Sequence, residues 1–248
     1  MKFPGDSPTV PSTTFSNSTD PGRNPGVARE LRFLLAGPER RLLRALATRI
    51  PAPVTPDHLT ALGVLGALGA AVAYAWSRYT PAWLWMASGM LVVQWLGDSL
   101  DGTLARVRGV ERPRYGYYLD HVVDAGSTAA IGLGIGLSPY IDLGLALGVV
   151  VVYLALSINV YLESNVFGVF RLAYSRLGPT ELRIIMILAN TALAFSAPGP
   201  PLALVANGTV ALLGLGMIGL LAGRVGENLR ALALQEPPLK PPRTVTGS

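Results

Sequence analysis

The sequence contains no cysteine, and only 14% of its residues are charged. Without cysteine the chain can form neither disulfides nor thiolate-bound metal sites, and its two histidines supply few ligands for zinc. A soluble domain carries about a quarter charged residues, so the shortage of charge indicates that much of the chain faces lipid. Residues 1–25 contain no apolar run, and we therefore expect no secretory signal peptide there.

Hydrophobic residues make up half of the chain, and its mean hydropathy is +0.43. Most of them lie in six apolar runs, which occupy residues 59–76, 83–100, 122–140, 143–160, 182–197 and 202–222. Most of these runs approach the roughly 20 residues that a helix needs to cross a bilayer. The fifth run is short and contains Arg183 and Asn190. We predict an all-α, polytopic membrane protein with six transmembrane helices.

The flanking segments differ in composition from the apolar runs. The predicted organisation is a disordered segment (1–26), an amphipathic juxtamembrane helix (27–54), the six-span domain (55–225) and a cytoplasmic tail (226–248). In the second segment, Leu43 and Leu46 share one side while Arg40 and Arg44 supply a polar face, with an interruption near residues 37–38. This pattern is typical of a helix that lies in the membrane interface, although a solvated helix packed on the domain fits it too.

The basic residues are distributed unevenly around the six runs. A net charge of +5 could indicate nucleic-acid binding, but the charges flank apolar runs instead of forming one basic face, so we expect no nucleic-acid partner. With both termini cytoplasmic, all of the 20 Lys and Arg residues except Arg78 fall on the cytoplasmic side. This asymmetry predicts an integral protein of the cell (inner) membrane with that orientation.

Two pairs of aspartates lie at the facing ends of the second and third apolar runs. Asp98 and Asp101 are three residues apart, and Asp120 and Asp124 are four residues apart. Because consecutive spans bring these ends to one depth, we expect the four carboxylates to converge near the cytoplasmic interface. An ionisable residue at the bilayer centre costs roughly 2.5–3.5 kcal/mol. Although this cost falls near the interface, four like charges together still require compensation.

Bound divalent cations would provide that compensation. Mg²⁺ and Mn²⁺ prefer oxygen ligands, and two such ions about 3.5–4 Å apart would hold the attacking and leaving oxygens of a phosphoryl reaction. Alternatively, the aspartates cap helices or pair with the nearby arginines, which are Arg106, Arg108, Arg112 and Arg114. Four acids at these spacings favour the two-metal site at the cytoplasmic face.

The residues around the aspartates form a longer pattern. The sequence has the form D-x2-D-G-x2-A-R, nine further residues, and then G-x3-D-x3-D. This pattern resembles the signature of the CDP-alcohol phosphatidyltransferases. All eight fixed positions are present: Asp98, Asp101, Gly102, Ala105, Arg106, Gly116, Asp120 and Asp124. The motif covers 27 residues, and the six-span layout extends the resemblance over about residues 55–225.

The resemblance implies roles for these residues. The four aspartates would bind Mg²⁺ or Mn²⁺, and Asp124 would also be the general base that deprotonates the acceptor hydroxyl. Four positions would form the CDP pocket, namely Gly102, Ala105, Arg106 and Gly116. The enzyme would move a phosphoalcohol or phosphatidyl group from a CDP-linked donor to an alcohol acceptor, at least one of them a lipid, and release CMP in phospholipid biosynthesis. The family also suggests a homodimer.

The identity of the transferred alcohol is left open by the sequence. His121 and the segment 178–181 resemble features of the choline and ethanolamine phosphotransferases, although an interfacial residue and an ordinary helix start explain them as well. The alternative donor is CDP-diacylglycerol, with inositol phosphate, glycerol phosphate or serine as acceptor. Arg171, Arg176 and Arg183 could bind an anionic headgroup or simply mark the cytoplasmic side.

Two other functional classes fit parts of the pattern. A membrane transporter could use the aspartates as a cation site, but the remaining spans offer little ionisable pathway. A non-catalytic membrane scaffold would not need the complete set of aspartates. We therefore predict an enzyme.

Overall fold

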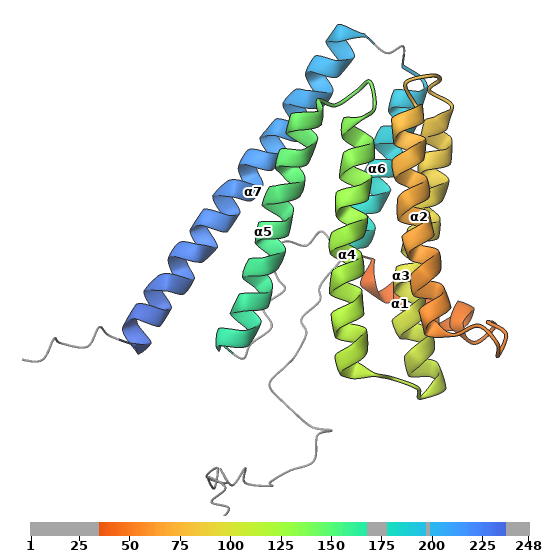
Figure 1. Cartoon of the computed structure of the whole chain (residues 1–248), viewed down its shortest axis with the longest axis vertical. Helices are drawn as coiled ribbons and strands as arrows, with labels where there is room; N and C mark the ends of the chain where they lie inside the picture. The colour runs from red at the N-terminus through yellow and green to blue at the C-terminus, as the bar shows by residue number, and fades with distance from the viewer. Residues whose placement is uncertain (1–34, 168–177, 197–198, 237–248) are drawn as a thin grey trace, which may run out of the picture.

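The computed structural model describes residues 35–167, 178–196 and 199–236. Within these residues the chain forms seven α-helices and no strand (Figure 1). The helices are α1 (Ala36–Ala47), α2 (Pro56–Trp76), α3 (Trp83–Arg108), α4 (Pro113–Gly136), α5 (Leu143–Phe167), α6 (Pro179–Ala194) and α7 (Pro200–Gln235). Each of the six apolar runs coincides with one of the helices α2 to α7. The prediction of an all-α protein is confirmed for the described residues.

Three of the helices are long and apolar enough to cross a membrane, namely α2, α5 and α7. Helix α6 has 16 residues, which is short of the usual span. Helices α3 and α4 carry the charged motif residues near their facing ends. The chain is thus a membrane protein by the composition of its helices, while the crossing by all six remains a prediction.

Helices α2 and α3 approach each other through glycines. A Cβ atom on Gly66 would lie 2.5 Å from the backbone nitrogen of Gln94, and one on Gly97 would collide with the backbone of Gly63. Small residues of this kind let membrane helices pack backbone against backbone. Since Asp98 directly follows Gly97, this close contact also sets the distance between the first motif aspartate and α2.

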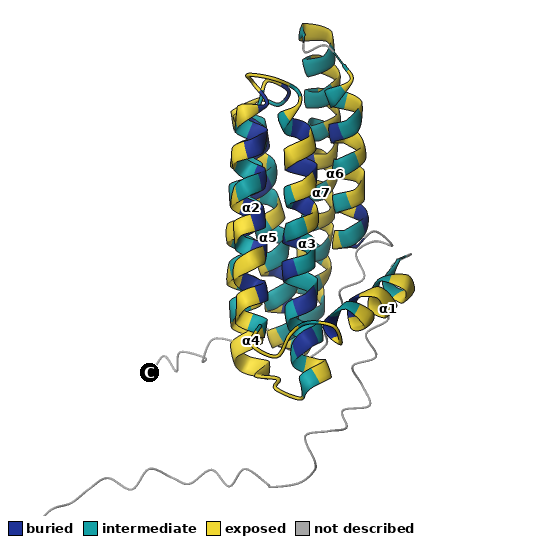
Figure 2. Ribbon diagram, turned by 90° about the vertical axis from the view of Figure 1, so that its right-hand side faces the viewer, coloured by how far each residue is buried: buried dark blue, intermediate teal, exposed yellow. Residues whose placement is uncertain are grey.

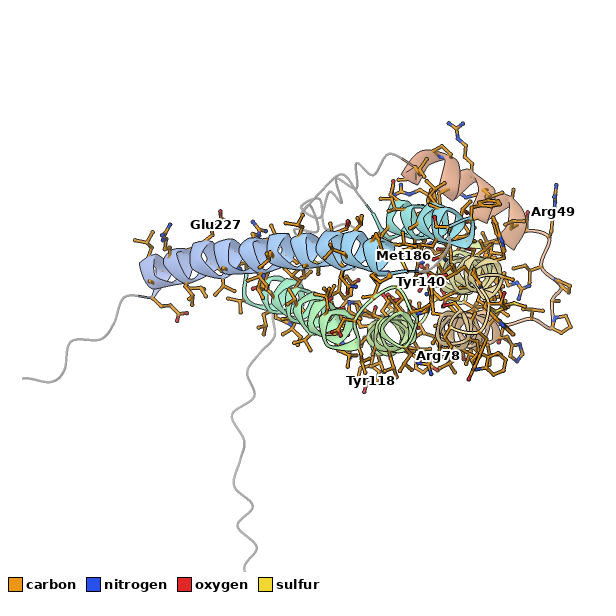
Figure 3. All side chains as sticks on the ribbon, turned by 90° about the horizontal axis from the view of Figure 1, so that it is seen from above. Arg49, Arg78, Tyr118, Tyr140, Met186 and Glu227 are labelled. Atoms are coloured by element: carbon orange, nitrogen blue, oxygen red, sulfur yellow. The ribbon has the colours of Figure 1, made fainter. Side chains whose placement is uncertain are left out.

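A buried polar residue ties α6 to this pair. The side-chain amide of Asn190 donates to the hydroxyl of Tyr74 at 2.9 Å and to that of Ser88 at 3.1 Å. The residues around it belong to the apolar core between α2 and α3, where Leu84 and Leu91 are fully buried. Viewed from above, Tyr140 and Met186 lie within the bundle, whereas Tyr118 points outward (Figure 3). Asn190 therefore stabilises the bundle because its polar group is satisfied.

Helix α1 packs obliquely against the end of the bundle that carries the α3–α4 connection (Figure 2). It buries Leu43 and Ala47 against Leu59, Leu100 and Leu104, while its arginines are exposed. Positions 37–38 lie in the first turn of α1. Residues 27–34 of the predicted juxtamembrane helix lie outside the described residues, so the interruption near positions 37–38 and the interfacial amphipathic helix stay predictions.

Helix α7 leans away from the rest of the bundle and packs on α5 (Figure 1). Polar side chains join the two helices: Glu163 of α5 accepts from Arg224 at 3.3 Å and from Asn228 at 2.6 Å, both on α7. Asn159 donates to the same carboxylate from one turn earlier in α5, at 2.8 Å. Buried carboxylates are tolerated where they are paired and hydrogen-bonded, as Glu163 is.

Candidate active site

The chain reverses direction between α3 and α4. Helix α3 ends at Gly109, whose φ of +65° lies in the left-handed region that favours glycine, and Pro113 begins α4. This short connection lays the last turns of α3 beside the first turns of α4. The two aspartate pairs are therefore brought to the same end of the bundle.

A cavity of about 670 Å³ lies at this end. Residues of α2, α3, α4 and α5 line it, and all eight fixed positions of the motif are among them. Its volume is in the usual range for small-molecule sites, which is about 300–1,000 Å³. The two halves of the motif, which are separated by nine residues in the sequence, therefore face one common space.

Three of the four aspartates form a compact cluster. Asp98, Asp120 and Asp124 each offer a carboxylate oxygen, and these oxygens lie within 4.8 Å of one another. Asp98 and Asp124 are partly buried, whereas Asp120 is exposed. An all-oxygen, negatively charged set of this kind is suited to a hard divalent cation and not to zinc. The residues present therefore fit the divalent metal that the motif implies.

The fourth aspartate has a different environment. Asp101 lines the same cavity but does not belong to the three-carboxylate cluster. Its carboxylate accepts hydrogen bonds from the hydroxyl of Thr60 on α2 at 2.6 Å and from the backbone N–H of Gly102 at 2.5 Å. Thr60, which sequence reasoning missed, thus orients one of the motif acids from a helix 41 residues away in the chain.

Arg183 of α6 contacts the cluster directly. Its guanidinium donates to the carboxylate of Asp98 and to the side-chain oxygen of Gln94, each at 2.8 Å. Both members of the ion pair are mostly shielded from solvent. The sequence left Arg183 as either a headgroup ligand or a marker of the cytoplasmic side, because a partner 85 residues away cannot be read from local spacing. Arg171 and Arg176, which were considered with it, lie outside the described residues.

Helix α5 supplies a wall that the sequence did not predict. Tyr153, Ser157 and Tyr161 line the cavity, and their spacing of four residues places them on one side of α5. The only signal in the sequence was this polar stripe within an apolar run. His121 lies between the rings of Tyr117 and Tyr161, at centroid distances of 4.1 and 4.4 Å.

The predicted nucleotide-binding positions leave room in the cavity. Among the described residues, a Cβ atom on Gly116 would meet nothing within 4 Å, and one on Gly102 would only touch the side chain of Arg106, at 3.4 Å. Packing against the described part of the chain therefore does not explain these glycines. Gly102, Ala105, Arg106 and Gly116 all line the cavity, so a ligand could approach the backbone closely there.

The connection between α3 and α4 is held by contacts to α2 and to the segment before it. The guanidinium of Arg108 donates to the carbonyl oxygens of Ile50 at 3.0 Å and Pro51 at 2.9 Å. Arg112 pairs with Asp57 in the first turn of α2. Of the arginines between the two aspartate pairs, Arg108 therefore binds backbone carbonyls of the segment before α2, and Arg112 binds an acid of α2. These contacts are not made to the motif aspartates.

The segment 178–181 has a structural role. Glu181 is buried, and its carboxylate accepts from the backbone N–H of Leu35 at 3.0 Å and of Gly178 at 2.9 Å. The neighbouring Thr180 donates to Glu39 of α1 at 2.7 Å. This segment thus begins α6 and fastens α1 to it.

Comparison with known proteins agrees with the motif and the cavity. The model of the family described as CDP-alcohol phosphatidyltransferase matches residues 53–220. The chain belongs to this family. It is also 36% identical over 86 residues to a phosphatidylinositol phosphate synthase of Cutibacterium acnes (strain DSM 16379 / KPA171202). That match covers 35% of this chain and 39% of the relative, so the chain spans about two fifths of the length of the curated relative.

Membership in this family agrees with the motif that the sequence contains. The aspartate cluster lies where the family motif predicts a metal site. The comparisons give the transporter interpretation no support.

Proposed function

We propose that this enzyme transfers a phosphatidyl group from CDP-diacylglycerol to a hydroxyl of a phosphorylated inositol and releases CMP. The observation that carries the proposal is the convergence of Asp98, Asp120 and Asp124 in one cavity with the glycines of the motif. Family membership supports the reaction class. The name of the bacterial relative supports the choice of donor and acceptor.

The chemistry proceeds by one displacement at phosphorus. The carboxylate of Asp124 takes the proton of the acceptor hydroxyl, and the oxygen attacks the phosphorus that bears the diacylglycerol. The bond between this phosphorus and the bridging oxygen of CMP breaks, and CMP leaves with the electron pair. Positioning and charge neutralisation contribute most of the rate in such reactions.

Asp98, Asp120 and Asp124 would hold a divalent ion. Asp101, whose carboxylate is bound by Thr60, would contribute to metal binding from the side of α2. Mg²⁺ or Mn²⁺ in a two-metal site would supply neutralisation of the charge that develops on the pyrophosphate. Gly102, Ala105, Arg106 and Gly116 line the part of the cavity that we assign to the cytidine nucleotide.

An anionic acceptor accounts for Arg183 better than a neutral lipid does. Arg183 reaches the cluster, where it neutralises Asp98 and would lie beside an acceptor phosphate. The two features that resemble the choline and ethanolamine phosphotransferases serve packing and capping within the bundle, since His121 stacks between two tyrosines and Glu181 caps α6. These contacts favour the reaction in which CDP-diacylglycerol is the donor.

We further propose that all six helices α2 to α7 cross the cell membrane with the cavity at the cytoplasmic face. The uneven distribution of Lys and Arg supports this orientation. Helices α3, α4 and α6 would then be spans that tolerate polar residues because these face the interior of the bundle.

A screen for CMP release tests the proposed function. The purified protein is incubated with CDP-diacylglycerol, CDP-choline or CDP-ethanolamine, each against inositol phosphate, glycerol phosphate, serine or diacylglycerol, with and without Mg²⁺ or Mn²⁺. We expect metal-dependent CMP release with CDP-diacylglycerol and inositol phosphate. Release only with CDP-choline or CDP-ethanolamine and diacylglycerol would overturn the choice of substrates. No CMP with any pair would overturn the function.

A further inference from the structure

A second, smaller cavity of about 220 Å³ adjoins the active-site cavity. We call it the side cavity; its lining consists of Asp124, Ala125, Tyr153, Leu154, Ser157, Ile158 and Tyr161. It lies between α4 and α5, which pack side by side (Figure 1). Four of its residues also line the active-site cavity: Asp124, Tyr153, Ser157 and Tyr161. The two spaces therefore meet at the aspartate that we assign as the general base.

The lining of the side cavity changes in character along its length. Acidic and hydroxyl groups lie where it meets the active site, whereas Ala125, Leu154 and Ile158 line the side cavity alone. Ile158 is 56% exposed, so the wall that it forms reaches the outer surface of the bundle. Helix α5 is apolar enough to cross a membrane, and only 11% of its most apolar part is buried within the protein. The outer surface at Ile158 is therefore suited to hydrocarbon.

We propose that the side cavity binds the hydrocarbon part of the lipid substrate and leads it outward between α4 and α5 into the bilayer. This inference rests on the proposed function and adds the path that the lipid takes. The reacting phosphorus joins a polar nucleotide to an apolar diacylglycerol, so the two groups need environments of opposite polarity on either side of it. The nucleotide positions on α3 and α4 lie in the polar cavity, and the apolar exit begins at Asp124.

The proposal predicts different effects for the same substitution at two residues of α5 that are similarly exposed. Ile158 and Leu162 lie one turn apart and are 56% and 57% exposed, but only Ile158 lines the side cavity. The variant Ile158→Trp would fill the exit, whereas Leu162→Trp places the same indole on the same helix outside it. A general effect of a large aromatic side chain on α5 should therefore appear in both variants.

Steady-state kinetics with the reconstituted full chain provide the test. For Ile158→Trp we expect the KM for long-chain CDP-diacylglycerol to rise about tenfold. Its KM for the water-soluble acceptor and its metal titration should match the wild type, and Leu162→Trp should match the wild type throughout. With a CDP-diacylglycerol analogue whose acyl chains are truncated, Ile158→Trp should regain wild-type kinetics, which a merely structural defect would not allow.

A labelling experiment keeps the proposal testable if Ile158→Trp does not fold. CDP-diacylglycerol with a photoreactive group on the first acyl carbons is irradiated with the wild-type protein. Crosslinks to Ala125, Leu154 or Ile158 are expected, and crosslinks confined to α2 or α7 would overturn the proposal. Equal KM values for Ile158→Trp and wild type would also overturn it. Failure of the proposed function looks different, because then the wild-type protein itself releases no CMP.

Discussion

The α2–α3 pair and the α5–α7 pair are held together by different interactions. Between α2 and α3 the contact is made by backbone atoms, since Gly66 and Gly97 leave no room for a side chain. Between α5 and α7 the contact depends on side chains, with Glu163 bound by Arg224 of the other helix. Backbone packing fixes a distance closely, whereas an ion pair spans a wider separation. The motif aspartates of α3 lie on the pair that packs through glycines, and the α5 wall of the cavity lies on the pair that is joined by side chains.

This difference suggests that the two helix pairs have different roles in the active site. The closely packed pair positions the reacting groups, because Asp98 follows Gly97 and Asp101 is oriented by Thr60 of α2. The other pair provides a wall and, in our proposal, the exit for the lipid. Variants in the first pair should therefore affect turnover and folding more strongly than variants in the second.

The largest expected effect comes from Asp124 of α4, the helix that packs on both α2 and α5. Asp124→Asn keeps the size of the side chain but removes the general base, so kcat should fall by about 10²–10⁴-fold. The thermal unfolding midpoint and CMP binding should change little. CMP release measures kcat, and isothermal titration measures CMP binding. Wild-type turnover of Asp124→Asn would show that another group accepts the proton.

The next effect distinguishes two aspartates of α3. Asp98 belongs to the three-carboxylate cluster, whereas Asp101 is bound by Thr60 and Gly102. Asp98→Asn should raise the metal concentration for half-maximal activity by about 10–100-fold, and Asp101→Asn should raise it less. Metal titrations of CMP release measure both. A larger shift for Asp101→Asn would mean that the metal lies nearer to α2 than the cluster indicates.

The close packing of α2 and α3 predicts opposite effects of one substitution at two glycines of α3. Gly97→Ala should lower the free energy of unfolding by about 1–3 kcal/mol, because the new Cβ atom collides with the backbone of Gly63. Gly89→Ala should raise it by about 0.4–1 kcal/mol, since its Cβ atom meets nothing within 4 Å and the unfolded chain loses freedom. Thermal unfolding in detergent compares them, and equal destabilisation would contradict the packing.

The smallest effect is expected in the α5–α7 pair. Glu163→Gln removes the charge that faces Arg224 and should lower the free energy of unfolding by about 1 kcal/mol. Glu227→Gln is the matched control: Glu227 contacts the same arginine at 3.3 Å but is 67% exposed, and its loss should cost less than about 0.5 kcal/mol. Unfolding curves of both variants in the same detergent decide the point. If Glu227→Gln cost more, the buried contact would not be what joins α5 to α7.

Much of the architecture followed from local patterns in the sequence. Runs of apolar residues predicted the helices α2 to α7 because hydrophobic length is a property of contiguous residues. Helix α1 lies within the segment 27–54, for which a juxtamembrane helix was predicted, and residues 27–34 of that segment lie outside the described residues. An ordinary helix start was one of two interpretations of the segment 178–181, and α6 does begin at Pro179. The contacts of this segment with Leu35 and Glu39 could not be read from spacing.

By itself the sequence determined that four aspartates lie on two consecutive helices, because the apolar runs and the spacing of the motif decide this. That all eight motif positions line one cavity was seen only in the tertiary structure. Only the tertiary structure decided which aspartates gather together, since Asp98 meets Arg183 of α6 whereas Asp101 turns to Thr60 of α2. It also decided that α5 closes the cavity. These contacts join helices that are distant in the chain, and the packing of whole helices, not the order of residues, sets the distances between them.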